Sequence, residues 1–504
     1  MTAAEDGVWS EIIDLTAINR TDNTDSLPTT DASRVAGTIR GHLPPGAPDW
    51  VYLPVRIPEG GTWFAARYQY SRPETPDGAI GNAADLGVFD PRGIDLAIGQ
   101  GFRGWSGGAR SEFLIAESVA TPGYLPGPVP AGIWHVVLAP YTVSAAGMDF
   151  EVEVEVGFGT PPDRADALPA RDNPAPPVIA GHGAGWYRGD SHLHTIFSDG
   201  KRTPAQAAQL ARERGLNFMI STEHNTSAAH RIWGDHAGSD LLIISGEEVT
   251  TRTGHLLALG IEPGSWIDWR FRASDGRLRE IVDRIHDHGG IAVAAHPYGG
   301  CIGCFWRFGF DDLDAVEVWN GAWDIGNEAA VATWDNLLVA GIRRRDEHHR
   351  WLPAMGNSDA HAEPDLIGLP QTVVAADRLG SAEITAGIAA GRSWITDSAD
   401  IDLSFTASDD RHTAGIGQHL HCSALRPVTV VAHIVGVPGG SVRLITDQGP
   451  LHTASIDESG EATVSWQTTA TVSRYVRAEV RHRLTDRTLP YGAMAALTNP
   501  IFLG

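Results

Sequence analysis

Between residues 190 and 361 one arrangement recurs along the chain, in which histidine, aspartate or glutamate lies just past a short apolar run. The polar members of the pattern are His192 and His194, Glu223 and His224, Glu248 and His255, His296, and Asp359 and His361. Short apolar strands that alternate with helical segments are typical of a parallel α/β sheet or barrel. The carboxyl ends of parallel barrel strands converge on one mouth, so we expect these groups to share one site.

The mixture of imidazoles and carboxylates indicates a metal site. On a strand, His192 and His194 project from one face because Leu193 faces the other. A His-x-His pair on its own is as often a surface pair as a ligand pair, but its recurrence with the later groups favours a shared cluster. Nitrogen and carboxylate ligands together suit zinc, manganese or iron rather than calcium or a thiolate-bound metal.

These motifs resemble the PHP (polymerase and histidinol phosphatase) superfamily, and within it the CehA/McbA-type metallohydrolases. The resemblance covers most of the chain and is most specific over residues 190–396. It is carried by His-x-His with Ser-Asp-Gly, Thr-Glu-His-Asn, Val-Thr-Thr-Arg-Thr-Gly-His, Ala-His-Pro, Glu317-Val-Trp-Asn-Gly, Asn-Ser-Asp-Ala-His and Gly391-Arg-Ser-Trp-Ile-Thr, with Val476-Arg-Ala-Glu-Val-Arg and Ala496-Leu-Thr-Asn-Pro-Ile in the tail. It implies an α/β fold, a distorted (β/α)7 barrel flanked by β-sandwich domains.

The resemblance also implies two or three divalent metal ions, zinc, manganese or iron. The matching positions are His192, His194, Asp199, His224, Glu248, His255, His296, Asp359 and His361. Glu248 is preferred to Glu247 because strand alternation turns Glu247 the opposite way, and a carboxylate at 248 could bridge two cations. Many PHP proteins have Thr-Asp-His where this chain has Thr-Glu223-His224. Glu223 is therefore either a group that orients the ligands or a solvated side chain, with equal weight.

The expected activity is metal-dependent hydrolysis by a metal-bridging hydroxide, with no protein nucleophile. Asp359 or His361 is expected to accept the proton or pass it to the leaving group. Arg252 is placed to contact an anionic substrate, although a surface salt bridge explains it equally well. Phosphomonoester or phosphodiester hydrolysis is favoured because the ligand set suffices for three metals. The alternatives are carbamate, ester or amide hydrolysis of the carbaryl hydrolase type, and a non-catalytic metal-binding protein with carbohydrate- or partner-binding β-domains.

Turn and strand signals divide the chain into four parts. Residues 1–158 read as an N-terminal β-sandwich, 159–182 as a proline-rich linker, 183–397 as the barrel and 398–504 as a C-terminal β-sandwich. Capping residues and glycines predict barrel helices over 204–214, 278–288 and 329–340. Trp105 and Trp134 could form a sugar-binding platform, but core packing is the better explanation in a small sandwich.

Composition limits the partners and the compartment. The 504 residues carry 38 basic and 62 acidic side chains, a formal charge of -24 that disfavours nucleic acid. We expect a small-molecule substrate, possibly anionic, no membrane and possibly a homo-oligomer. Because no leader or long apolar run is apparent, a bacterial cytoplasmic protein is expected. Three cysteines do not make a disulfide framework, and Cys301-Ile-Gly-Cys304 is expected to be loop packing rather than a metal or redox site.

Overall fold

A computed structural model describes residues 9, 11–16, 34–74, 76, 80–96, 100–344, 351–485, 489 and 491–504. The chain forms two compact units. The first unit comprises Met1–Asn173 with two loops, Thr195–Gly200 and Glu223–Arg231, and the second unit comprises Pro174–His194, Lys201–Thr222 and Ile232–Gly504. Each unit is described by itself.

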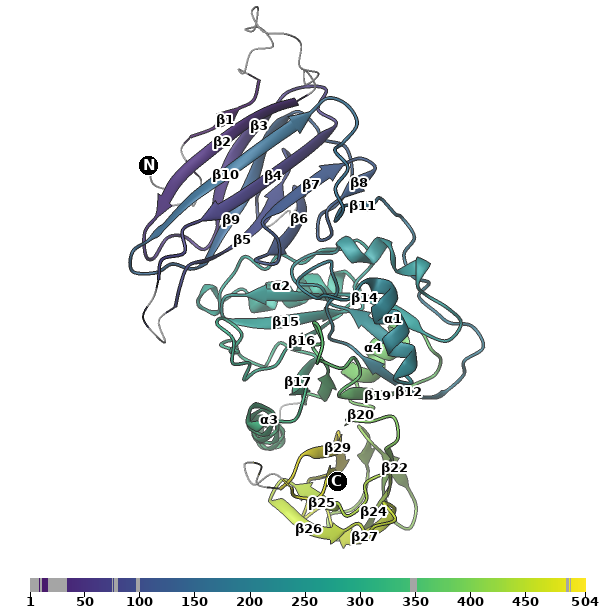
Figure 1. The fold of residues 1–504 in the computed structure, drawn as a ribbon. Coiled ribbons are helices and arrows are strands. Elements are labelled where there is room, and N and C mark those ends of the chain that lie inside the picture. Colours follow the sequence, from purple (N-terminus) through teal and green to yellow (C-terminus); the bar gives the residue numbers. More distant parts are fainter. Residues whose placement is uncertain are drawn as a thin grey trace, which may run out of the picture. The chain divides into compact units, whose positions relative to one another are not determined.

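The first unit is built on a two-sheet β-sandwich (Figure 1). One sheet has the order β1 (Ile13–Asp14), β3 (Val51–Ile57), β9 (Gly132–Thr142), β5 (Ala83–Phe89), β6 (Phe102–Gly107). The other has the order β11 (Leu168–Pro169), β8 (Val119–Ala120), β7 (Glu112–Ala116), β4 (Trp63–Tyr70), β10 (Met148–Gly157), β2 (Arg34–Leu43). Strand β11 lies in the predicted linker, so part of that proline-rich segment adds an edge strand to the sandwich.

Alternation along β10 explains the sandwich. Val152, Val154 and Val156 are fully buried between the sheets, while the intervening glutamates face out. Trp105 and Trp134 are 3% and 0% exposed, which confirms that they pack in the interior rather than form a surface platform. The core of this unit therefore follows from period-two patterning.

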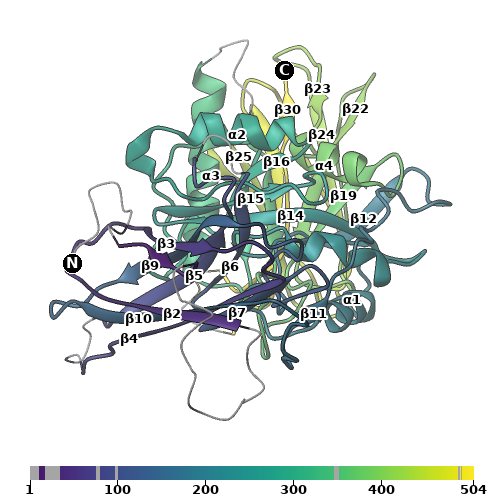
Figure 2. The same cartoon turned by 90° about the horizontal axis from the view of Figure 1, so that it is seen from above.

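The second unit contains a long mixed sheet. Its first nine strands are β12 (Gly185–Asp190), β13 (Phe218–Ser221), β14 (Leu242–Thr251), β15 (Gly254–Leu259), β16 (Ile291–Ala294), β17 (Ala315–Asn320), β18 (Ala354–Asn357), β19 (Gln371–Ala376) and β20 (Ser393–Thr396). Neighbours run in the order β18-β17-β16-β15-β14-β13-β12-β19-β20, and β14, β15 and β16 lie side by side in both views (Figures 1 and 2). The α/β class is therefore confirmed, in a sheet-rich form.

A regular (β/α)7 barrel is not confirmed. Strand β15 runs antiparallel to both β14 and β16, because the turn between Thr251 and Gly254 is too short for a crossover helix. The helices of the second unit are α1 (Pro204–Glu213), α2 (Leu278–Asp287), α3 (Ile325–Arg344) and α4 (Ser381–Ala389), with 3-10 turns η2 (Trp233–Asp235) and η3 (Ala273–Asp275); η1 (Ala228–Arg231) belongs to the first unit. Within the described residues, no α-helix links β13 to β14 or β16 to β17.

The predicted helices are found, with one change of length. Thr203 caps α1 in a capping box with Gln206, and Pro204 is its first residue, as the sequence predicts. Helix α3 is longer than predicted, since it begins at Ile325 and runs through Gly341. A glycine costs a helix interior only about 1 kcal/mol, so packing can carry the helix past it.

The C-terminal strands continue the same sheet. Strand β29 (Met494–Thr498) pairs with β20 and is followed by β28 (Tyr475–Arg481), β25 (Ser441–Thr446) and β26 (Gly449–Ser455), while β30 (Ile501–Leu503) pairs with β28 and β23 (His419–Leu420). A separate sheet holds β22 (Thr413–Gly415), β21 (Asp402–Ser408), β24 (Val428–Val435) and β27 (Ala462–Thr468). The predicted boundary at 397 thus falls inside a region whose strands share one sheet, and the domain boundaries stay predictions.

No described helix has the length and apolar character needed to cross a membrane. The first eight residues, on which the expectation of no leader depends, lie outside the described residues.

Candidate metal centre

Two chain segments that are far apart in sequence meet just beyond β12 and β18. An isolated parallel bridge joins Leu193 to Ala360. The Asp359 amide donates to the His192 carbonyl at 2.7 Å, and the His194 amide donates to the Ala360 carbonyl at 3.1 Å. Because side chains alternate along both segments, the two histidines of one segment come to face Asp359 of the other.

Asp190 fixes these two segments to each other. Its carboxylate accepts hydrogen bonds from the Ser358 hydroxyl at 2.5 Å, the Ser358 amide at 3.1 Å and the Gly368 amide at 2.8 Å. Complete burial raises the pKa of Asp190 to about 6, although these donors act against the rise. The sequence motif contained Asp190, but the prediction passed over it.

One group of possible ligands lies around Asp359 Oδ1 and Glu248 Oε2. His192 Nε2 is 3.2 Å from the Asp359 oxygen and 3.3 Å from the Glu248 oxygen, and His194 Nε2 is 3.0 and 3.4 Å from the same two atoms. The ligand atoms of these four residues all lie within 4.8 Å of one another. All four come from the second unit.

A second group is built on the other oxygen of Glu248. Glu248 Oε1 is 2.8 Å from His255 Nδ1 and 3.2 Å from His296 Nε2. Glu248 is fully buried, and its two oxygens belong to two different ligand groups. This is the arrangement that a carboxylate bridging two cations requires.

The positions of Glu248 and His255 differ from the expectation that each polar group follows a strand. Both lie inside strands, since β14 continues to Thr251 and pairs with β15 in a hairpin. Glu247 points the opposite way, as alternation predicts, and its carboxylate accepts a hydrogen bond from the Ile267 amide at 2.9 Å. Burial raises the pKa of Glu247 well above its usual range.

Glu317 is a supporting carboxylate that the prediction missed. It is fully buried, and its Oε1 accepts from His192 Nδ1 at 3.2 Å and from the Asn357 amide group at 2.8 Å. Its Oε2 accepts from the His296 backbone amide at 2.8 Å and from Asn320 Nδ2 at 3.0 Å. A ligand histidine commonly donates its second ring nitrogen to a carboxylate in this way. The signal was available, because Glu317 begins the Glu-Val-Trp-Asn-Gly motif and is a lone carboxylate inside an apolar strand.

The carboxylates and imidazoles of the cluster show whether these residues fit a metal ion. With Nδ1 donating to Glu317, His192 Nε2 presents a lone pair to two carboxylate oxygens, and this buried nitrogen makes no hydrogen bond. Burial alone would lower the pKa of His192, but Asp359, Glu317 and Glu248 raise it well above its usual value. The cluster therefore needs protons or cations to balance it, and its donor set fits divalent metals of the zinc, manganese and iron type.

The pKa values of His296 and Asp359 are shifted by the charged groups around them. Burial alone would lower the pKa of His296, yet Glu248 and Asp359 raise it. Burial alone would raise the pKa of Asp359, but His192 and His194 hold it well below its usual range. The Asp359 carboxylate is thus kept ionised, which is the form that binds a cation.

Backbone strain is concentrated at these positions. Within the described part of the chain, the non-glycine residues with positive φ are Asn225 at 53°, His296 at 24° and Asp359 at 51°. Such conformations cost about 1–3 kcal/mol each and persist where the surroundings impose them, often at functional sites. Two of the three residues are themselves predicted ligands, and the third follows His224.

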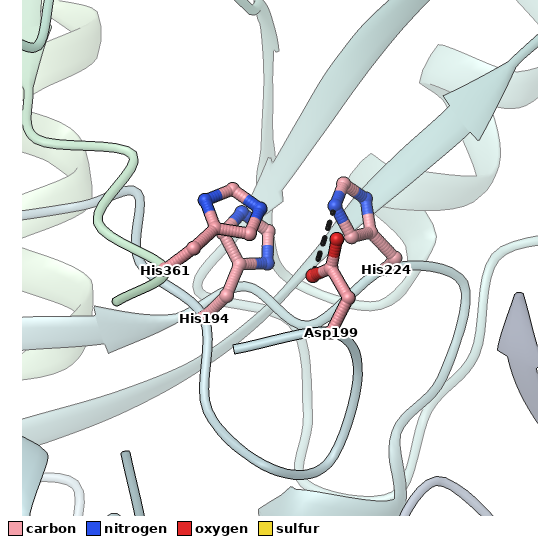
Figure 3. A group of neighbouring side chains, drawn as sticks. All are labelled: His194, Asp199, His224 and His361. Carbon is pink, nitrogen blue, oxygen red and sulfur yellow. Dashed lines mark ion pairs between the residues drawn. The ribbon is translucent and has the colours of Figure 1, made fainter. Parts of the chain in front are cut away.

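The remaining predicted site residues fall in three places. His361 stacks on His194 with ring centroids 4.1 Å apart, and its Nδ1 donates to the Asp359 carbonyl at 2.8 Å. In the first unit, His224 Nε2 lies 3.5 Å from Asp199 Oδ1; Figure 3 draws both pairs. Arg252 lies partly buried in the turn between β14 and β15. Ligand and catalytic roles for all of these residues stay predictions.

Glu223 is buried rather than solvated. It is 1% exposed, and its carboxylate accepts from the Thr195 amide at 3.1 Å, from the Thr195 hydroxyl and from the Ser198 hydroxyl at 2.5 Å. On the same loop Arg110 donates to the Ser198 carbonyl at 3.0 Å and to the Ile196 carbonyl. Glu223 therefore binds the loop that carries Asp199, and a role in orienting the ligands stays a prediction.

Cys301 and Cys304 are bonded to each other in a disulfide, so loop packing does not fully describe them. Cys304 is buried and Cys301 is exposed. The pair closes the turn 301–304, a short distance along the chain from His296.

No family model matches the chain. It is 26% identical over 156 residues to an uncharacterized protein of Methanocaldococcus jannaschii, covering 26% of this chain and 81% of that protein. It is 34% identical over 85 residues to a phosphoribosyl 1,2-cyclic phosphate 1,2-diphosphodiesterase of Eggerthella lenta, which is 15% of this chain and only 32% of the relative. A solved two-domain protein of Bacteroides vulgatus, which contains a predicted PHP-like metal-dependent phosphoesterase, aligns with 15% identity and a TM-score of 0.34 over 65% of this chain and 99% of that one. A TM-score of this size establishes neither a shared fold nor a shared function.

Proposed function

We propose that this protein is a metal-dependent hydrolase of the PHP type, of the CehA/McbA branch, and that it hydrolyses phosphoesters. The observation that carries the proposal is Glu248, whose two carboxylate oxygens each belong to a separate group of buried ligands. A carboxylate shared in this way is suited to two cations held close together. Paired cations are the usual means of stabilising both oxygens in phosphoryl displacement.

The residues of the second unit would hold the metals in two sets. His192, His194 and Asp359 would bind one cation, and His255 with His296 would bind the other, with Glu248 shared. Bound divalent cations supply Lewis acidity and lower the pKa of water toward neutrality. Asp199, His224 and His361 remain predicted members of this ligand set.

The protein groups orient these ligands and move the proton. Glu317 fixes the His192 tautomer by accepting from Nδ1, and Asp190 holds the segment that carries Asp359. Asp359 and His361 lie at the exposed side of the cluster, 20% and 30% exposed, where a leaving group would need a proton. Arg252 is proposed to contact an anionic part of the substrate.

Phosphoester hydrolysis is favoured over carbamate hydrolysis by two points. The relative from Eggerthella lenta is named for a cyclic phosphate diesterase activity, and it is 34% identical over the matched segment. Clustered cations also stabilise the negative charge of a phosphate group more effectively than a single cation does. A non-catalytic metal site would leave the strained, partly exposed Asp359 without a purpose.

The test is hydrolysis by metal-analysed protein. p-Nitrophenyl phosphate, bis-p-nitrophenyl phosphate and an aryl N-methylcarbamate are compared in wild type, His194→Ala and His433→Ala, the last a control because His433 is exposed on β24. We expect phosphoester turnover that is lost in His194→Ala and kept in His433→Ala. Carbamate turnover alone would reassign the protein to carbamate hydrolysis, and bound metal with no turnover would contradict the enzyme.

A further inference from the structure

A cavity of about 160 Å³ lies next to the metal cluster in the second unit. Residues that line it include His296, Tyr298, Glu317, Asn320, Asp324 and Asn327. Its volume is below the about 300–1,000 Å³ of pockets that hold drug-sized ligands. It can therefore take only a small group, of the size of a short polyol or a sugar ring.

Two lining residues connect the cavity to the cluster. His296 Nε2 is 3.2 Å from Glu248 Oε1, so its ring lies between the second ligand group and the cavity. Asn320 Nδ2 donates to Asp359 Oδ2 at 3.3 Å and to Glu317 Oε2 at 3.0 Å. The cavity therefore borders the cluster and shares His296 and Glu317 with its surroundings.

The wall opposite His296 is the start of helix α3, and it is held firmly. Asn327 accepts from the Asn320 backbone amide at 2.9 Å and donates to the Asn320 carbonyl at 3.2 Å. Asp324 Oδ1 accepts from the Asn327 amide at 2.9 Å and so caps the helix. A site whose walls are fixed before binding loses less affinity to ordering.

Two glycines on the wall are closely packed against their neighbours. A side chain at Gly299 would meet His296 Nδ1 at 2.8 Å and Cys304 Cβ at 3.0 Å. A side chain at Gly326 would meet Asp324 Oδ1 at 3.2 Å. A larger residue at either position would therefore displace a residue that lines or adjoins the cavity.

The charged groups on the cavity wall are acidic. Glu317 already accepts hydrogen bonds from four donor groups. Asp324, by contrast, is exposed, and within the described residues only its side-chain Oδ1 accepts a hydrogen bond, from the Asn327 amide. No lysine or arginine is among the described residues that line the cavity. Such a wall repels a carboxylate or a second phosphate and attracts hydroxyl donors.

We propose that this cavity binds the alcohol portion of the substrate, and that the substrate is a phosphate ester of a small hydroxylated alcohol, a polyol or a sugar. Asp324 is the residue that selects for hydroxyl groups. The proposal rests on the proposed function, since the ester itself would be held at the cluster.

The test compares three phosphate monoesters with the same three-carbon chain, namely glycerol phosphate, propyl phosphate and phosphoglycerate. Wild type is expected to show kcat/KM at least about tenfold higher for glycerol phosphate than for the other two, which is the effect of one hydrogen bond to a charged group. Asp324→Asn removes the charge but keeps a capping side chain. It should raise KM for glycerol phosphate by about tenfold and weaken discrimination against phosphoglycerate, with kcat and bound metal unchanged.

Asp283→Asn is the matched control, because Asp283 is an exposed residue on α2 whose partner is Arg279. It should leave the order of the three esters as in wild type. A preference for propyl phosphate in wild type, or an undiminished preference for glycerol phosphate in Asp324→Asn, would overturn the proposal.

A binding measurement separates this proposal from the proposed function. If metal-loaded protein turns over neither these esters nor the p-nitrophenyl mono- and diester, the hydrolase proposal has failed, and the cavity is tested with free alcohols by saturation-transfer NMR. Turnover of the p-nitrophenyl substrates without any preference for glycerol phosphate would overturn the cavity proposal alone. A pentitol signal that is lost in Asp324→Asn would support the cavity as a polyol site. Equal signals for the pentitol and pentanediol, or none for either, would contradict it.

Discussion

The second unit buries carboxylates in two regions, and different side chains balance their negative charge in each. In the metal centre, carboxylates face imidazoles, and strained backbone holds them in place. On strand β28, by contrast, Glu479 lies between Arg477 at 2.8 Å and Arg481 at 3.1 Å. The same two arginines reach helix α3, where Arg477 pairs with Asp335 at 2.6 Å and Arg481 pairs with Glu328.

The difference lies in what supplies the positive charge. Guanidinium groups remain charged and form fixed, planar contacts, so protein side chains alone supply both signs of charge in the β28 network. Imidazoles can give up their protons, so the metal centre can exchange protons for cations. We therefore expect the network that contains arginine to stabilise the fold. We expect the network that contains imidazole to bind metal.

The largest expected effect comes from Glu248→Gln. This change removes the charge that both ligand groups share, so we expect kcat/KM to fall by at least about three orders of magnitude. Metal content should fall with it, while the far-ultraviolet circular dichroism stays that of wild type. Full metal occupancy in the variant would show that Glu248 is not a shared ligand.

Breaking the β28 network should lower the free energy of unfolding and leave metal binding unchanged. Arg477→Met leaves Glu479 and Asp335 short of a buried partner, and loss of one partner from a buried ion pair costs about 3–5 kcal/mol. Urea unfolding should show this loss, and metal analysis should show the wild-type content. Reduced metal content with unchanged stability would reverse the assignment of the two regions.

At low pH, protonation of Glu479 should weaken the β28 network. Burial alone would raise the pKa of Glu479, but Arg477, Arg481 and Arg443 lower it to about 2, against an ordinary value of 4.5. Because the folded pKa is lowered, this stabilisation is complete above about pH 4.5 and is lost as the pH falls toward 2. The shift corresponds to about 3 kcal/mol.

The measurement is the free energy of unfolding in urea between pH 6 and pH 3.5 for wild type and Glu479→Gln. The difference between the two proteins should shrink as the pH falls. Glu458→Gln, at an exposed pair with Arg483, is the control and should show no such trend. A constant difference for Glu479→Gln would contradict the lowered pKa.

The smallest effect is expected at the contact between Glu317 and His192. Glu317→Gln keeps the shape of the side chain but weakens the acceptor for His192 Nδ1, so metal affinity should fall by about 10–100-fold. Competition with a chromogenic chelator measures this affinity. An unchanged metal affinity would mean that Glu317 only fills space.

Some of the site could be predicted because it is encoded by local pattern. Alternation placed His192 and His194 on one face and turned Glu247 away from Glu248. Capping residues set the start of α1, and period-two patterning set the core of the sandwich. These features depend on residues that are close together in the chain, so the sequence alone is enough to predict them.

The rest depended on contacts between distant residues. The sequence could not show that β15 runs antiparallel inside the sheet, that α3 passes Gly341, or that β29 extends the sheet from β20. Glu317 is 125 residues from His192, and only the packed sheet brings their side chains together. The sequence by itself determined which residue types could bind metal; the tertiary structure decided which of them lie close enough to form one candidate ligand group, because that depends on distances set by strand pairing.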